Sequence, residues 1–353
     1  MKGMLNCTMA TLMVLGCSFA LCSCSDDDGN AESTQESYTP PVAPVEDYTC
    51  VRPDFLREGD MIAIVSPSYV TDEETMTKGM HAIRAMGFVP VLAPNVNKAY
   101  LEKYAGTPAE RTADLEWAYA NSDIKAIMTT RGGYGAIQLL PLLNADVLSA
   151  NPKWLIGYSD ITTLLSFSVS AKVMAIHGTM LSSLKSTGGT SYDDTLLKSL
   201  LTGLLPHYEW QSSAHANRPG TATGMLVGGN MSTFTPLIGS DYDFTSHGDI
   251  ILFVEEIGEN ARNIDRMMHS LRLHGVLSRV KGILVGDFAN CGDEFRIGSI
   301  EEMLSKYTLS DMDIPIAYGF RAGHAGVNMP LVIGAQATLD VTANAASLTF
   351  QLP

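Results

Sequence analysis

The sequence has few basic residues and lacks the spacings of familiar metal and nucleotide sites. Lysine and arginine number 23 against 38 aspartate and glutamate residues, for a net charge of −15. Such an acidic chain is poorly suited to bind nucleic acid through charge. The eight histidines form no His-x-x-x-His or His-Glu-x-x-His pattern, and no Cys-x-x-Cys occurs. We therefore expect neither a zinc site nor, without a Walker or full Gly-x-Gly-x-x-Gly pattern, a cofactor.

Long apolar runs are also scarce. The run near the N-terminus covers about residues 9–21, follows Lys2, and is short for a bilayer span, which is typical of a signal-peptide core. It ends in Leu-Cys-Ser-Cys, which resembles a bacterial lipobox with Cys24 as the lipidated residue. Cys17 is a rival position, and an ordinary secretory signal is the alternative. We expect residues 1–24 to be a lipoprotein signal peptide and the mature protein to be lipid-anchored in the cell envelope, on the outer membrane, facing the periplasm or the surface.

Residues 25–50 are rich in Ser, Asp, Glu and Pro, a composition that cannot bury a core. We expect this stretch to be a disordered tether. Beyond it, Cys50 and Cys291 are the cysteines that remain. An oxidising envelope would permit them to pair, and two separate thiols are equally consistent with the sequence.

The rest of the chain reads as two α/β parts. In residues 51–185, short apolar runs such as 61–65 and 154–157 alternate with helical stretches, which predicts a parallel sheet covered on both faces. Residues 186–220 are less regular and are taken as a link. Residues 221–353 predict a strand-rich α+β domain that closes in a hairpin.

The first candidate for chemistry is Ser159. It lies in residues 157–160, between an apolar strand and a helical stretch, where a sharp turn would expose its hydroxyl beside free backbone N–H groups. The full nucleophile-elbow pattern also has glycine two residues after the serine, where Ile161 stands. A plain helix N-cap is the alternative interpretation.

Three other segments follow predicted strands. Residues 131–135, Arg-Gly-Gly-Tyr-Gly, allow a close approach of backbone to a ligand, although a plain tight turn would look the same. Glu255 and Glu256 end an apolar strand, and only one of two neighbours can point to a given face. His324 stands between two glycines, one directly before it and one two residues after it, which indicates a shaped loop, although a lone histidine is more often structural.

These segments, taken together and in order, resemble the LD-carboxypeptidase family of serine peptidases. The resemblance runs from about Asp60 to the C-terminus. It is carried by residues 65–68, 131–135, 157–162, 177–178, 228–230, 254–259 and 264–267, and by Gly323-His324 with Asn328.

The resemblance implies an N-terminal parallel α/β domain with the nucleophile and a C-terminal domain that supplies Glu and His. The implied residues are a triad of Ser159, Glu255 and His324, oxyanion N–H groups of Asp160 and Gly133, and substrate contacts from Tyr134, Asn230 and Ser66.

The implied activity is that of a serine carboxypeptidase that hydrolyses the L,D amide bond of murein tetrapeptides and releases terminal D-alanine. The resemblance implies two partners, a small murein peptide and a second copy of the chain in a homodimer, and the lipobox-like segment adds the membrane through the lipid anchor. The alternatives are a microcin-immunity-like peptidase that cleaves peptidyl-nucleotides or other amide conjugates, and an inactive surface binding module.

Overall fold

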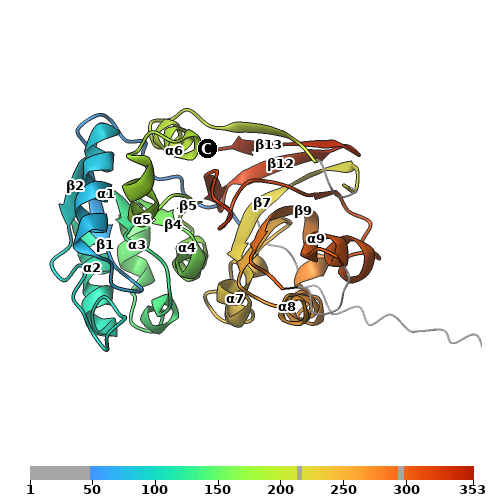
Figure 1. Cartoon of the computed structure of the whole chain (residues 1–353), viewed down its shortest axis with the longest axis horizontal. Helices are drawn as coiled ribbons and strands as arrows, with labels where there is room; N and C mark the ends of the chain where they lie inside the picture. The colour runs from blue at the N-terminus through green and yellow to red at the C-terminus, as the bar shows by residue number, and fades with distance from the viewer. Residues whose placement is uncertain (1–47, 213–216, 293–297) are drawn as a thin grey trace, which may run out of the picture. The chain divides into compact units, whose positions relative to one another are not determined.

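In the computed structural model, residues 48–212, 217–292 and 298–353 are described, and they contain two β-sheets (Figure 1). The predicted signal peptide, Cys24 and nearly all of the predicted tether lie outside these residues. Within the same ranges, no helix has both the length and the apolar character that a membrane span requires.

The first sheet has six strands in the order β11-β5-β4-β3-β1-β2. Its strands are β1 (Met61–Val65), β2 (Val89–Leu92), β3 (Ile124–Thr129), β4 (Trp154–Gly157), β5 (Ala175–His177) and β11 (Leu331–Ile333). The pairs among β1 to β5 are all parallel, and β11 is antiparallel to β5. The predicted parallel sheet is confirmed, and its carboxyl edge is where the loops of interest emerge.

Helices α1 to α4 connect the parallel strands, as such crossovers require, and α5 and α6 follow β5. The bounds of the helices are α1 (Glu73–Ala85), α2 (Pro108–Ala120), α3 (Ala145–Ala150), α4 (Thr162–Ser170), α5 (Leu181–Thr187) and α6 (Tyr192–Leu201). Local sequence explains where several of them begin. Thr107 and Glu110 form a capping box at the start of α2, with Pro108 as its first helical residue.

The second sheet has seven strands in the order β10-β9-β8-β7-β12-β13-β6. Four are parallel, namely β7 (Gly220–Asn230), β8 (Ile250–Ile257), β9 (Val280–Ala289) and β10 (Ile316–Ala317), and three are antiparallel, namely β12 (Gln336–Val341), β13 (Ala345–Gln351) and β6 (His207–Gln211). The helices of this part are α7 (Met231–Phe234), α8 (Ala261–Leu273) and α9 (Ile300–Met303). The strand-rich second half and its closing hairpin are confirmed.

The boundaries between the parts differ from the prediction in two places. The stretch 186–220 is more than a link, because it holds α6 and also β6, the edge strand of the second sheet. Conversely, β11 comes from the C-terminal half but completes the first sheet, with Leu331 paired to His177. A strand of three residues carries too little periodicity to be assigned to a sheet from sequence.

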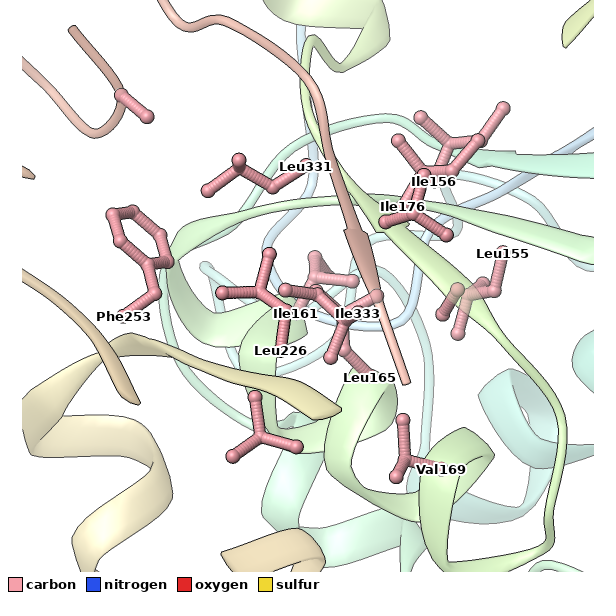
Figure 2. Close-up of a cluster of buried hydrophobic side chains, with 14 of the residues drawn as sticks. Leu155, Ile156, Ile161, Leu165, Val169, Ile176, Leu226, Phe253, Leu331 and Ile333 are labelled. Carbon is pink, nitrogen blue, oxygen red and sulfur yellow. The ribbon is translucent and has the colours of Figure 1, made fainter. Parts of the chain in front are cut away.

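A shared core joins the two sheets (Figure 2). Apolar side chains from β4, α4 and β5 meet side chains from β7, β8 and β11 there. The labelled members are Leu155, Ile156, Ile161, Leu165, Val169, Ile176, Leu226, Phe253, Leu331 and Ile333. Because such interiors are close-packed, this core fixes the carboxyl end of β4 relative to β8.

Candidate active site

Ser159 stands at a strained turn directly after β4. Its φ is +64°, a left-handed value found at only six non-glycine positions among the described residues, and such a conformation costs about 1–2 kcal/mol. A Cβ at Gly157 would lie 2.5 Å from Thr129 Oγ1 and 2.7 Å from Ile161 Cγ2. Glycine before the serine therefore makes room for Ile161, the residue that departs from the usual elbow pattern.

The glycine loop after β3 lies against this turn. A Cβ at Gly132 would be 3.0 Å from Ser159 Oγ and 3.4 Å from the Asp160 amide nitrogen. That amide stands in the first turn of a 3-10 helix (Ser159–Ile161), where N–H groups have no intrahelical acceptor. The loop backbone thus lies against both the serine hydroxyl and the Asp160 amide. The oxyanion roles of Asp160 and Gly133 stay predictions.

The Asp160 side chain links three loops through hydrogen bonds. Its Oδ2 accepts hydrogen bonds from Ser68 Oγ at 2.6 Å and from the Ala136 amide at 2.9 Å. Burial raises the pKa of this carboxyl, and these hydrogen bonds and the charge of Arg111 oppose the rise. The loops after β1, β3 and β4 are therefore held in a fixed relation around Ser159.

Glu255 and His324 form a buried pair. The Glu255 Oε2 atom is 2.8 Å from His324 Nδ1, and the exposed fractions of the two side chains are 0% and 11%. Burial raises the pKa of Glu255, and the bond to His324 opposes the rise. A carboxylate at Nδ1 selects the imidazole tautomer whose Nε2 is free to accept a proton.

Tyr158 lies between this pair and Ser159. Its ring centroid is 5.0 Å from that of His324 and 5.9 Å from that of His177, and it directly precedes Ser159 in the chain. The ring contact thus places the Glu255–His324 pair next to the residue that precedes Ser159, and the triad of Ser159, Glu255 and His324 stays a prediction.

A β-bulge shapes the strand end that carries Glu255. Between Val254 and Glu256 the pairing of β8 moves from Val285 to Phe288 of β9, so β9 has one extra residue there. Asp287 lies in the bulge, and its Oδ2 accepts a hydrogen bond of 3.2 Å from the Ala325 amide, next to His324. Bulges of this kind commonly direct side chains at functional sites.

Asn328 anchors the histidine loop, although the sequence assigned it no role. Its Oδ1 accepts from the Gly323 amide at 3.0 Å and lies 3.1 Å from His177 Nε2. The backbone amide of Asn328 donates a hydrogen bond of 3.0 Å to Asp193 Oδ2. Burial lowers the pKa of His177 to about 3, so this second histidine stays neutral. Asp193, on α6, gave no sequence signal because its contact spans 135 residues.

The Glu256 carboxylate is engaged in hydrogen bonds within the protein. Its carboxylate accepts from Asn230 Nδ2 at 2.8 Å and from the Ser232 amide at 2.7 Å. Ser66 is also buried and is hydrogen-bonded to Thr130. Of the three predicted substrate contacts, Asn230 and Ser66 are therefore engaged internally, whereas Tyr134 is 50% exposed.

The remaining sequence questions concern metals and cysteines. In the described ranges, no group of three or more His, Cys, Asp or Glu side chains could hold a metal ion. Cys50 is buried, Cys291 is half-buried, and neither is in a disulfide.

Comparison with known proteins gives the class and then the family. Residues 62–178 match the LD-carboxypeptidase N-terminal domain, and residues 223–339 match the LD-carboxypeptidase C-terminal domain. A protein of Synechocystis sp. named as a carboxypeptidase is 32% identical, with 84% of this chain and 95% of the relative covered. A probable murein peptide carboxypeptidase of Bacillus subtilis is 30% identical over 84% of this chain and 93% of its own. The protein is thus a peptidase by class, and it belongs to the LD-carboxypeptidase family.

A solved structure agrees with this assignment. The structure of MccF in complex with glutamyl sulfamoyl guanosine superposes with a TM-score of 0.72 at 25% identity, and covers 86% of this chain and 99% of that one. The two-sheet architecture is therefore that of the family.

Proposed function

We propose that the protein is a serine-type LD-carboxypeptidase that removes terminal D-alanine from murein tetrapeptides. The observation that carries the proposal is the buried Glu255–His324 pair beside the strained turn of Ser159. A carboxylate, an imidazole and a serine at a strand-to-helix turn together make an activated nucleophile.

In the proposed reaction, Ser159 Oγ attacks the carbonyl carbon of the scissile amide, and His324 Nε2 accepts the hydroxyl proton. The amides of Asp160 and Gly133 donate hydrogen bonds to the oxyanion that forms. His324 then gives its proton to the leaving amine of the released residue, and the acyl group stays on Ser159. Water, deprotonated by His324, hydrolyses this ester and restores the serine.

The substrate class is inferred from the relatives. The Bacillus subtilis relative is named for murein peptide, and murein tetrapeptides end in D-alanine joined to a diamino acid. We therefore place the cleaved bond between these two residues, with three residues on the acyl side.

The direct experiment is to incubate the chain from residue 25 onward with a murein tetrapeptide and with its all-L counterpart. Mass spectrometry should detect alanine released from the first and little from the second. The Ser159→Ala variant should release none, with Ser186→Ala, a change at an exposed serine, as the control. Equal release from both peptides would contradict the L,D specificity.

A second candidate is cleavage of a peptidyl-nucleotide or another amide conjugate. The likeness to MccF bound to glutamyl sulfamoyl guanosine favours it. Cleavage of such a conjugate without release of alanine from the tetrapeptide would select this candidate. Binding of both ligands without turnover would instead indicate the inactive binding module, which the intact Glu255–His324 pair disfavours.

The proposed reaction uses no metal. Prolonged treatment with a chelator should leave the rate of alanine release unchanged. A loss of rate that zinc restores would contradict the serine mechanism.

We further propose that Cys24 carries a lipid that holds the protein on the outer membrane, facing either the periplasm or the surface. Cys24→Ser should move the protein from the membrane fraction to the soluble fraction. If Cys17→Ser releases the protein from the membrane while Cys24→Ser does not, the lipid is on Cys17 and the predicted cleavage site is wrong. The predicted homodimer is checked separately by analytical ultracentrifugation of the chain from residue 25.

A further inference from the structure

Arg111, on α2, carries a buried charge that the proposed reaction does not use. The residue is only 2% exposed. Its guanidinium donates hydrogen bonds to the carbonyls of Pro67 at 2.5 Å, Gly106 at 3.0 Å and Gly135 at 3.0 Å, and to Gln138 Oε1 at 2.7 Å. All four acceptors are uncharged. Burying a charge costs free energy, so a guanidinium at this place calls for a reason beyond filling space.

Two of the loops that accept from this guanidinium are also held by the Asp160 carboxylate. In the peptide group between Gly135 and Ala136, the carbonyl accepts from the guanidinium at 3.0 Å, and the N–H donates to Asp160 Oδ2 at 2.9 Å. In the loop after β1, the Pro67 carbonyl accepts from the guanidinium, and the neighbouring Ser68 hydroxyl donates to the same Oδ2 at 2.6 Å. The two loops therefore lie between a buried cation and a buried anion.

The two charges support each other across these loops. Burial raises the pKa of Asp160 and lowers that of Arg111, and the charge of each residue opposes the shift of the other. The dipole of the Gly135–Ala136 peptide is aligned with both charges, because its oxygen faces the cation and its N–H faces the anion. Hydrogen bonds to charged groups are stronger than those between neutral groups. Removing the guanidinium should therefore loosen both loops at once.

The clamped peptide closes the glycine loop that lies against Ser159. Gly133 and Gly135 have φ of 129° and 123°, values that residues other than glycine rarely adopt. Glycine also has the most backbone freedom, so a loop rich in it needs contacts from outside to hold its N–H groups in one direction. In the proposed reaction the N–H groups of Gly133 and Asp160 stabilise the oxyanion, and such donors are effective because they are aligned in advance.

We propose that Arg111 is a positioning residue for the oxyanion site, which it aligns by clamping the glycine loop and the loop after β1 against Asp160. This inference rests on the proposed function, because it concerns the oxyanion of that reaction. At 2% exposure the guanidinium acts through the carbonyls that it contacts. Lysine cannot replace it, because an ammonium is a compact point charge, whereas the guanidinium presents its donors in a rigid plane.

The test removes the guanidinium and then supplies it again. Arg111→Ala should lower kcat for alanine release by about 10²- to 10³-fold, the size of effect expected when an oxyanion donor is lost, with little change in KM. Guanidinium chloride, well below the concentrations that unfold the protein, should restore kcat in a saturable manner. Ammonium chloride at the same ionic strength should not. Arg111→Lys should also lower kcat, by a smaller factor.

A second measurement does not depend on the identity of the substrate. The rate at which a fluorophosphonate labels Ser159 depends on the same donors, because attack on phosphorus also places negative charge on an oxygen. Labelling should be slower in Arg111→Lys than in the unsubstituted chain, in the same proportion as kcat. If Arg111→Ala does not fold, this rate in Arg111→Lys decides the matter.

Arg218→Ala is the matched control. The Arg218 guanidinium also donates to backbone carbonyls, those of Leu309 at 3.0 Å and Ser310 at 3.4 Å. Arg218 precedes β7, however, at the edge of the second sheet opposite to the one that carries Glu255. Its loss should lower thermal stability and leave kcat and the labelling rate unchanged.

Normal kcat and normal labelling in Arg111→Lys would overturn the proposal. So would a loss of kcat in folded Arg111→Ala that guanidinium leaves unchanged, or an equal loss in Arg218→Ala. Failure of the proposed function is seen separately, because the unsubstituted chain would then be labelled at Ser159 without releasing alanine. The labelling rates would still test Arg111 in that case.

Discussion

The two halves of the active site are built differently. On the side of the first sheet, Ser159 is held by backbone geometry: a left-handed φ, a glycine before it, and a glycine loop against it. On the side of the second sheet, Glu255 and His324 are held by side-chain hydrogen bonds that extend through Asn328 to α6. One half depends on a few adjacent residues, and the other on contacts between residues far apart in the chain.

This difference has a consequence for substitutions. A backbone turn built from neighbouring residues keeps its form when the serine side chain is removed. A buried hydrogen-bond network leaves polar groups without partners when one member is removed, at a cost of about 1–3 kcal/mol for each group. Removal of the Ser159 hydroxyl should thus lower turnover with little loss of stability, whereas removal of a member of the network should lower stability as well.

The largest effect is expected at Ser159 and His324. Ser159→Ala and His324→Ala should each lower kcat by about 10⁴- to 10⁶-fold, and the double variant should lose little more, because activators of an absent nucleophile have no function. Steady-state kinetics at equal folded concentration decides this. Near-normal turnover of Ser159→Ala would exclude the serine mechanism.

Glu255 and Glu256, neighbours on β8, separate the two kinds of effect. Glu255→Ala should lower kcat by about 10³- to 10⁴-fold, because His324 loses its orientation. Glu256→Ala should be mild in turnover per folded molecule, but should lower stability because Asn230 and Ser232 lose their acceptor. Kinetics and urea unfolding of both variants provide the check, and a larger loss of turnover at Glu256 would contradict the assignment.

Asn328 tests whether the histidine loop depends on the network. Asn328→Ala should lower kcat by about 10- to 100-fold, since unpaired Gly323 and His177 groups would shift the loop. The KM should change much less than kcat, because the residue is buried. An unchanged kcat with lowered stability would show that Asn328 is purely structural.

The lowered pKa of His177 predicts that the folded protein loses stability in acid. Its pKa is about 3 in the folded chain and about 6.5 when unfolded, so between these values the unfolded state binds more protons. Stability should therefore fall as pH falls through this window, by about 2 kcal/mol between pH 7.5 and 5. The raised pKa values of Glu255 and Asp160 act in the opposite direction, so the comparison with His177→Gln isolates the histidine. Urea unfolding at both pH values is the measurement. An equal loss of stability between pH 7.5 and 5 in the unsubstituted protein and in His177→Gln would refute the prediction.

The smallest effect concerns backbone strain at Ser159. Ser159→Gly should be more stable than Ser159→Ala by about 1 kcal/mol, because glycine adopts a φ of +64° without a Cβ conflict. Thermal unfolding of the two inactive variants measures this directly. A less stable glycine variant would show that the turn is not strained.

Several parts of the fold were accessible from sequence because their signals are local. The apolar run 61–65 forms a strand of the parallel sheet, and the glycine loop 131–135 stands at the carboxyl edge of that sheet. The closing hairpin was equally clear, since β12 and β13 alternate and are separated by three residues. The family resemblance added the order of Ser159, Glu255 and His324, which no single segment could establish.

Other features were decided by the tertiary structure, because they depend on contacts across long separations. The membership of β11 in the first sheet, the bulge opposite Glu255, and the link from Asp193 to Asn328 join residues far apart in the chain. The resemblance selected Glu255 over Glu256, but the physical reason for that choice lies in the packing. The two residues are adjacent, so their local sequence does not distinguish them. In the structure Glu256 accepts a hydrogen bond from Asn230, and Glu255 pairs with His324. Sequence by itself determined the local turns and strands of this protein, while packing determined which polar groups face each other in its active site.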